Sequence, residues 1–183
     1  MSYRLPLVIA ALALLGCSDV ATRPDSGKVV TDTTQGPGTT PTPDTTGIAQ
    51  RRLIECPTNQ TSVNSGLIGL LGGTVASAGS SITLPAQAVL TATLIELKVP
   101  ASTYMEIDLT ANGLLTFLFL KTVTVTIDYS RCPTSVTQGK ALSVWLINTQ
   151  TKALLVNMNG VNDPVARRIT FTTDHLSGYA IAQ

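Results

Sequence analysis

Hydrophobic and polar positions alternate along much of the second half of this sequence. In the segment TVTVTIDY, the residues Val123, Val125, Ile127 and Tyr129 occupy every second position, and the positions between them are threonine or aspartate. The segment TYMEIDLT, residues 103–110, alternates in the same way. Successive side chains of an extended chain point to opposite faces, so this period of two predicts β-strands with one buried face.

Further short segments have the composition of strands and are bounded by residues that favour turns. Clusters of Gly, Pro, Asn and Asp separate them, as in TANG, RCPTS, NTQTK and NGVNDP. No segment keeps a helical period with caps at both ends, and the residues after Pro85 are expected to form a single helical turn at most. The pattern therefore predicts an all-β fold, an antiparallel β-sandwich. The additional expected strands are residues 81–84, 94–99, 142–148, 153–157, 167–173 and 179–182.

The composition changes sharply before residue 51. Residues 18–50 are rich in Thr, Pro, Gly and Asp and contain few side chains that could form a core. We expect a disordered linker there, stiffened by its prolines, and a folded domain at residues 51–183. Over the whole chain 12 basic residues balance 11 acidic ones, and only 13% of residues are charged. This balance gives no basic stripe, so a nucleic-acid partner is not expected.

The amino terminus has the features of a secretion signal. Arg4 precedes an apolar run at residues 5–15, which is too short to span a bilayer but suits a signal peptide. The sequence Leu-Leu-Gly-Cys that ends at Cys17 resembles the lipobox of bacterial lipoproteins. The resemblance implies removal of residues 1–16 and attachment of diacylglycerol, with palmitate among its acyl chains, to Cys17. Residues 17–50 would then be a lipidated tether, and Ser18 resembles an outer-membrane address. The alternative is an ordinary secretion signal that ends near a cysteine.

Two cysteines remain in the folded part. Cys56 and Cys132 form an even pair in a chain that we expect to be secreted, so a disulfide is the simplest interpretation. A zinc site is the alternative, but one histidine and two distant cysteines do not supply a typical ligand set. We expect neither a metal nor another cofactor.

Several phrases resemble the ZU-five domain of tight-junction scaffolds, netrin receptors and ankyrins. The segment TVTVTIDY resembles the central strand of that family, and RRITFTTDHLSGYAIA resembles its ending. The resemblance covers residues 72–182, and it implies a β-sandwich that serves protein interaction and assembly. Gln87 stands where the family commonly has glycine, and Leu176 where it usually has phenylalanine. The other matching residues are Gly72, Gly73, Thr74 and Val75, then Leu84, Pro85, Ala86, Ala88 and Val89, and finally Thr93, Ile95 and Leu97.

The same resemblance raises the possibility of chemistry at His175, Leu176 and Ser177. Some relatives, and a related domain of adhesion receptors, cut themselves at a His-hydrophobic-Ser step. There the serine hydroxyl attacks the preceding carbonyl and the histidine takes its proton. The alternative is a turn in which Ser177 and Gly178 lead into the last strand and His175 is hydrogen-bonded. We favour the turn, because attack also requires a strained peptide and an oxyanion donor.

Other sequence features do not indicate catalysis. The segment GLIGLLGG lacks the Lys-Ser/Thr of a phosphate loop and is more typical of a flexible lead-in or a packed apolar loop. We expect Glu96, Glu106, Asp108 and Asp128 to lie on solvated strand faces. The chain is therefore expected to be a non-enzymatic protein of the bacterial envelope, anchored to a membrane, with an envelope or extracellular protein as its partner. Self-cleavage between Leu176 and Ser177 and carbohydrate binding are the alternatives, although aromatic residues are few.

Overall fold

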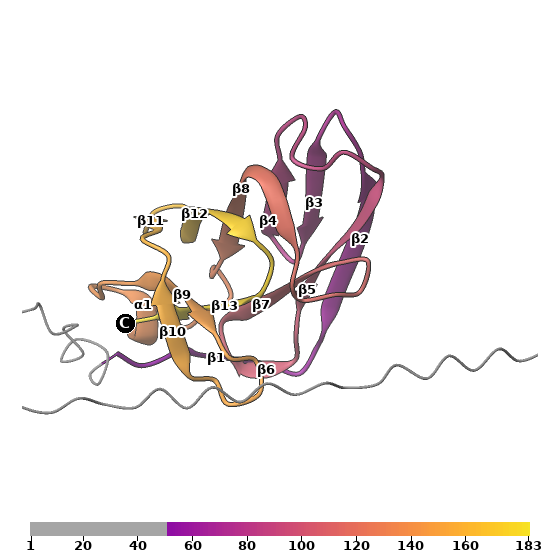
Figure 1. Ribbon diagram of the computed structural model, residues 1–183. Helices are drawn as coiled ribbons and strands as arrows, with labels where there is room; N and C mark the ends of the chain where they lie inside the picture. The colour runs from indigo at the N-terminus through magenta and orange to yellow at the C-terminus, as the bar shows by residue number, and fades with distance from the viewer. Residues whose placement is uncertain (1–50) are drawn as a thin grey trace, which may run out of the picture. The chain divides into compact units, whose positions relative to one another are not determined.

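The computed structural model describes residues 51–183, and it consists mainly of antiparallel β-strands (Figure 1). The predictions for the signal peptide, Cys17 and the linker lie outside the described residues. In chain order the elements are β1 (Glu55–Thr58), β2 (Ser62–Ile68), β3 (Gly73–Ser77), β4 (Ser80–Leu84), β5 (Thr93–Val99), β6 (Ser102–Tyr104), β7 (Glu106–Ala111), β8 (Leu118–Asp128), α1 (Thr134–Thr137), β9 (Ser143–Ile147), β10 (Leu154–Asn157), β11 (Val161–Asp163), β12 (Arg168–His175) and β13 (Gly178–Ala182).

The strands form two main sheets that enclose one core. The six-stranded sheet has the order β10-β9-β13-β7-β5-β2, the five-stranded sheet has the order β11-β12-β8-β4-β3, and β1 and β6 form a separate pair. The predicted β-sandwich is confirmed. The described residues belong to one compact unit with its own hydrophobic core.

The alternation that predicts β8 is reproduced by the burial of its side chains. Val123, Val125 and Ile127 are fully buried, and the threonines at positions 122 and 124 are exposed. β8 lies in the middle of the five-stranded sheet, between β12 and β4, so its hydrophobic face contributes to the centre of the core. The sequence pattern thus predicts which face of β8 is buried.

The prediction that four carboxylates lie on solvated faces is wrong for two of them. Glu106 is 1% exposed and Asp128 is 8% exposed. The outer face of the six-stranded sheet is covered at β9 and β13 by a second hydrophobic cluster around Trp145, and Glu106 lies on the neighbouring strand β7. Lys152, in the connection from β9 to β10, contacts Glu106 there. A strand whose two faces are both covered no longer separates buried from solvated residues by alternation.

Residues 51–71 supply strands that the sequence pattern does not predict. β1 and β2 come from this segment, and β2 pairs with β5 over its whole length. Within residues 51–183 the one helix is α1, in the segment expected to be a turn, and no helix follows Pro85. Instead Gln87 adopts a φ of 65°, a conformation that favours glycine. Its N–H donates to the carbonyl of Leu70, and its Oε1 accepts from Lys121.

Backbone hydrogen bonds join the two ends of the described part of the chain. Arg52 and Gln183 exchange two backbone hydrogen bonds of 3.1 and 2.9 Å, and the N–H of Ile54 donates to Ile181. These bonds continue the ladder of β13 beyond the end of its pairing with β7. The amino-terminal segment of the domain is thereby fixed beside its carboxyl terminus (Figure 1).

Candidate functional site

His175, Leu176 and Ser177 form the passage from one sheet to the other. β12 ends at His175 in the five-stranded sheet, and β13 begins at Gly178 in the six-stranded sheet. Leu176 is buried in the core, its N–H donates to the carbonyl of Phe117, and the carbonyl of Ser177 accepts from Leu109. Backbone hydrogen bonds to β7 and to the residue just before β8 therefore hold residues 175–177 in place.

The His175 side chain is oriented by its own strand. Its Nδ1 lies 2.9 Å from Oδ1 of Asp174 and 3.3 Å from Oγ1 of Thr173. The hydrogen bond with His175 lowers the pKa of Asp174. Within residues 51–183 no hydrogen bond joins the His175 ring to the Ser177 hydroxyl. In this structure the expected base thus contacts an aspartate and a threonine and does not contact the expected nucleophile.

The hydroxyl donors at this corner contact the carbonyl of His175 and not that of Leu176, which is the carbonyl that would react. The Tyr179 hydroxyl donates to the carbonyl of His175 at 2.8 Å, and the Thr173 hydroxyl donates to the same oxygen at 3.1 Å. Attack by Ser177 would develop negative charge on the oxygen of Leu176. A tyrosine hydroxyl is protonated at neutral pH and can donate, and burial, which raises the pKa of Tyr179 to about 12, extends that range to higher pH. This arrangement fastens a turn, which is the interpretation that the sequence favours.

Gly178 is required by packing. A Cβ at this position would lie 2.3 Å from the methyl carbon of Thr149, which belongs to the connection between β9 and β10. The connection therefore lies directly against the start of β13. The sequence places Gly178 in the turn, and in the structure the absence of a side chain there leaves room for Thr149. Thr173 and Tyr179, which hold the corner, were not predicted, although their place beside the histidine in the sequence is a signal for them.

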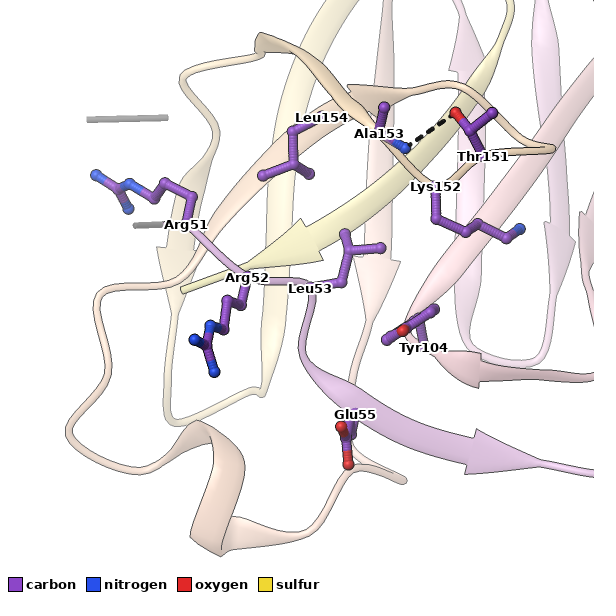
Figure 2. Close-up of a pocket in the computed structure, with 9 residues that line it drawn as sticks. All are labelled: Arg51, Arg52, Leu53, Glu55, Tyr104, Thr151, Lys152, Ala153 and Leu154. Carbon is purple, nitrogen blue, oxygen red and sulfur yellow. Dashed lines mark hydrogen bonds between the residues drawn. The ribbon is translucent and has the colours of Figure 1, made fainter. Parts of the chain in front are cut away.

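A second polar arrangement lies on the covered outer face of the six-stranded sheet. The Lys152 ammonium group lies 2.8 and 2.6 Å from the two oxygens of the Glu106 carboxylate. Asp108 lies two residues further along β7, and burial together with the charge of Glu106 raises its pKa. Lys152 also borders a cavity of about 570 Å³ that Arg51, Arg52 and Tyr104 help to line (Figure 2). Arg51 and Arg52 point away from Lys152 in Figure 2, so these cations do not converge on one anion.

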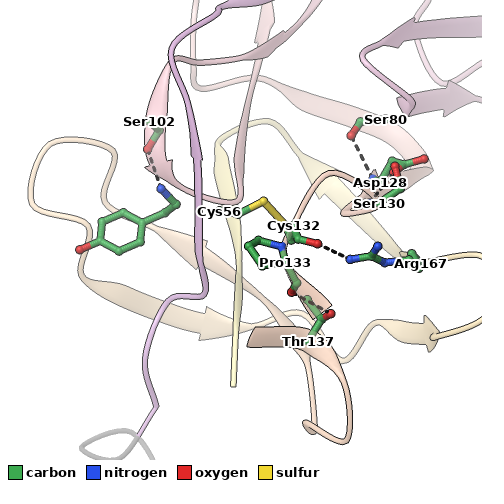
Figure 3. Close-up of a disulfide and its surroundings, with 10 residues drawn as sticks. Cys56, Ser80, Ser102, Asp128, Ser130, Cys132, Pro133, Thr137 and Arg167 are labelled. Carbon is green, nitrogen blue, oxygen red and sulfur yellow. Dashed lines mark hydrogen bonds between the residues drawn. A yellow bond between two sulfur atoms is a disulfide. The ribbon is translucent and has the colours of Figure 1, made fainter. Parts of the chain in front are cut away.

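The predicted disulfide is present and joins β1 to the segment after β8. Cys56 and Cys132 are bonded, with their Cα atoms 4.8 Å apart, and both are buried (Figure 3). The guanidinium group of Arg167 donates to the Cys132 carbonyl and lies over the ring of Tyr129, 5.8 Å from its centroid. This corner of the domain is therefore fixed by a covalent bond and by a cation.

Close to the disulfide, Asp128 is held by several groups (Figure 3). Its carboxylate accepts from the N–H of Ser130 at 2.8 Å and from Arg168 at 3.0 Å. Burial alone would raise the pKa of Asp128, but the hydrogen bonds from Ser130 and Arg168 outweigh it and lower the pKa below its ordinary value. Asp128 therefore favours the folded state when it is ionised.

Replacing Asp128 with asparagine is expected to destabilise the domain by about 1–2 kcal/mol at pH 7. The folded-state pKa is lower than the unfolded-state value, so the contribution is complete above the unfolded-state pKa of about 4. It is lost as the pH falls through the folded-state pKa. Urea unfolding at pH 7, 4 and 2.5 should show the difference between wild type and Asp128→Asn shrinking with acidity. Glu55→Gln, at an exposed position, is the control, and a difference that does not depend on pH would contradict the assignment.

Comparisons with known proteins do not place the chain in a family. No family model matches the sequence, and no curated protein matches it. The resemblance to the ZU-five domain therefore stays a prediction. Within residues 51–183, no helix is long and apolar enough to cross a membrane. Over the same residues, no group of three or more His, Cys, Asp and Glu side chains is placed to hold a metal ion.

Proposed function

We propose that this chain is a lipid-anchored protein of the bacterial cell envelope, whose sandwich is a non-enzymatic module that binds a protein partner. The observation that carries the partner assignment is the difference between the two sides of the sandwich. On one side the edge strands β2 and β3 are joined, because Asn64 donates to the carbonyl of Ala76 and the hydroxyls of Ser62 and Ser77 lie 2.8 Å apart.

On the other side the edge strands β10 and β11 are joined by the chain itself, through residues 158–160, and within residues 51–183 no hydrogen bond links the two strands. The six-stranded sheet ends at β10 and the five-stranded sheet ends at β11 (Figure 1). The side chains of Leu155, Val156 and Val161 are at least half exposed along these edges. We call β10 and β11 the open side. An edge strand presents unpaired backbone groups, and a partner can add a strand to it. Exposed aliphatic side chains on such an edge favour this mode of binding.

Photo-crosslinking in the native envelope tests the open side. A photoreactive residue at Val156 should give an adduct of one defined mass with a partner protein. A charged side chain on an edge opposes strand addition, so Leu155→Lys in the same chain should abolish the adduct. A photoreactive residue at Thr124, exposed on β8, is the matched control and should give none. Equal adducts from positions 156 and 124, or an adduct that survives Leu155→Lys, would count against the proposal.

The anchor is tested by the intact mass of the mature protein from a bacterial host. We expect a chain that begins at Cys17 and carries acyl groups, and we expect Cys17→Ala to abolish acylation. A signal peptide cleaved elsewhere, with no added lipid, would identify an ordinary secreted protein. Ser18 resembles an outer-membrane sorting signal, so we expect membrane fractionation to recover the acylated chain with the outer membrane.

The same mass measurement tests self-cleavage. We expect one unbroken chain, because the donors around His175 and Ser177 fasten the passage between the sheets and are not directed at the Leu176 carbonyl. A separate peptide of residues 177–183, lost in Ser177→Ala, would establish the alternative. Carbohydrate binding has less support, because the other two aromatic residues within residues 51–183, Tyr104 and Phe117, are half-buried and border different cavities, and five are buried: Trp145, Phe119, Phe171, Tyr129 and Tyr179. A glycan-binding screen tests that alternative.

A further inference from the structure

Exposed leucines gather at the end of the sandwich where β2 ends and β5 begins. Leu71 is 91% exposed, and Leu67, Leu90 and Leu114 are 60–70% exposed. They lie on three neighbouring connections, β2–β3, β4–β5 and β7–β8, or directly beside them. Leu67 is the cross-strand partner of Leu94, which is also exposed. We call Leu67, Leu70, Leu71, Leu90, Leu94 and Leu114 the leucine end. The segment GLIGLLGG, expected to be flexible or packed, in fact presents all three of its leucines, Leu67, Leu70 and Leu71, to solvent.

The leucine end is built from uncharged sequence. Residues 56–95 contain no Asp, Glu, Lys, Arg or His, and neither do residues 109–120. The fold brings these two stretches together, since Leu94 and Asn112 exchange hydrogen bonds and the N–H of Leu120 donates to Ala88. Lys121 follows the second stretch, and its ammonium group is engaged by the Ala86 carbonyl and Gln87. An apolar medium at this end would therefore desolvate few charges.

Part of the backbone of the connections is paired within the protein. Gly72 donates to the carbonyl of Gly69, Gln87 to that of Leu70, and Leu114 to that of Ala111. Unpaired backbone groups are what makes insertion of a loop into hydrocarbon costly. Here the bonds between and within the connections lower that cost.

From this combination we propose that the leucine end inserts into the surface of a phospholipid bilayer. Protein-binding hot spots are enriched in Trp, Tyr and Arg, and leucine is under-represented in them. The leucine end has none of those three residue types, and its side chains lie on the tips of separate connections. A fluid hydrocarbon surface accepts such tips without matching their shape, and exposed apolar patches can mark membrane interaction sites. In Figure 1 the β2–β3 and β4–β5 connections lie at the top, far from β1, β6 and the carboxyl terminus.

The proposal goes beyond the proposed function and does not depend on lipidation. It is tested with residues 18–183, which lack Cys17, and vesicles of uncharged phosphatidylcholine. We expect the chain to float with the vesicles at both low and high salt, because no cationic group drives binding. Leu70→Ser/Leu71→Ser should lower the partition coefficient about tenfold or more, since each buried leucine contributes strongly to transfer from water. Val161→Ser/Val165→Ser, at one exposed valine of β11 and one just after it, should leave the partition coefficient unchanged.

A fluorescent label gives a second measurement. An environment-sensitive dye on Leu71→Cys should shift to the blue with vesicles, and the same dye on Val165→Cys should not. Near-ultraviolet circular dichroism and the urea midpoint establish that each variant is folded. Absence of flotation, or flotation only with anionic vesicles at low salt, would overturn the proposal. Dimers that form without vesicles and disappear in Leu70→Ser/Leu71→Ser would also overturn it, by assigning the leucine end to protein contact.

Discussion

Removing the disulfide by replacing Cys56 and Cys132 together with alanine is expected to lower the free energy of unfolding by about 4–5 kcal/mol. The bond closes a loop with a sequence separation of 76 residues. In the chain-entropy model a loop of this length strongly restricts the unfolded chain. The bond also holds β1, which otherwise pairs only with the three-residue strand β6. Urea unfolding of the oxidised wild type and of the double variant measures the difference.

Reductant supplies the control for this prediction. Reduced wild type should unfold at nearly the urea concentration that unfolds the double variant, and reductant should leave the double variant unchanged. A double variant as stable as the oxidised wild type would show that the fold is maintained without the bond. The single variant Cys56→Ala leaves a free thiol at Cys132, so it is unsuitable for this comparison.

The second large effect is expected from the ion pair on the covered face of the six-stranded sheet. Lys152→Met should destabilise the domain by about 2–3 kcal/mol, because it leaves the buried carboxylate of Glu106 without its cation. This value lies near the low end of the range for buried pairs, because the Lys152 side chain is 33% exposed. Methionine keeps the length of the side chain. Lys152 has a φ of 60°, which glycine would adopt more easily, so a replacement with a side chain leaves this backbone preference unchanged. Urea unfolding at pH 7 provides the measurement.

A double-mutant cycle separates the pair from its surroundings. Glu106→Met/Lys152→Met should recover most of the stability lost in Lys152→Met, because a buried pair replaced by apolar groups of similar volume is often neutral. Lys140→Met is the matched control, since Lys140 is exposed and has no ion pair within residues 51–183, and it should change stability by less than about 0.5 kcal/mol. If Lys152→Met behaves like Lys140→Met, the pair does not stabilise the fold.

The strands with one buried face could be predicted from the sequence. Val123, Val125 and Ile127 alternate with threonines, and the structure buries the first set and exposes most of the second. The pairing of Cys56 with Cys132 also follows from counting cysteines. In both cases a local signal suffices, because side-chain period and cysteine number do not depend on which strands become neighbours.

Features that depend on neighbouring strands could not be predicted. Glu106 has the alternation of a solvated residue, and it is buried because Lys152, far away in the sequence, is placed above it. Tyr179 is expected in the core because it is aromatic. Its hydroxyl donates to the carbonyl of His175 only because the chain turns between β12 and β13. Leu70 and Leu71 look like core residues and are exposed, since no element within residues 51–183 covers that end.

The position of Cys56 determines how the domain responds to tension. A force applied to the chain before residue 51 first acts on the bonds between Arg52 and Gln183 and between Ile54 and Ile181. Once these break, the oxidised domain can release only residues 51–55. The load then passes through the sulfur atoms to Cys132 and so to the end of β8, which is held between β12 and β4. Under tension the oxidised domain is suspended from its central strand, whereas the reduced domain would unravel from β1 and β2 onward.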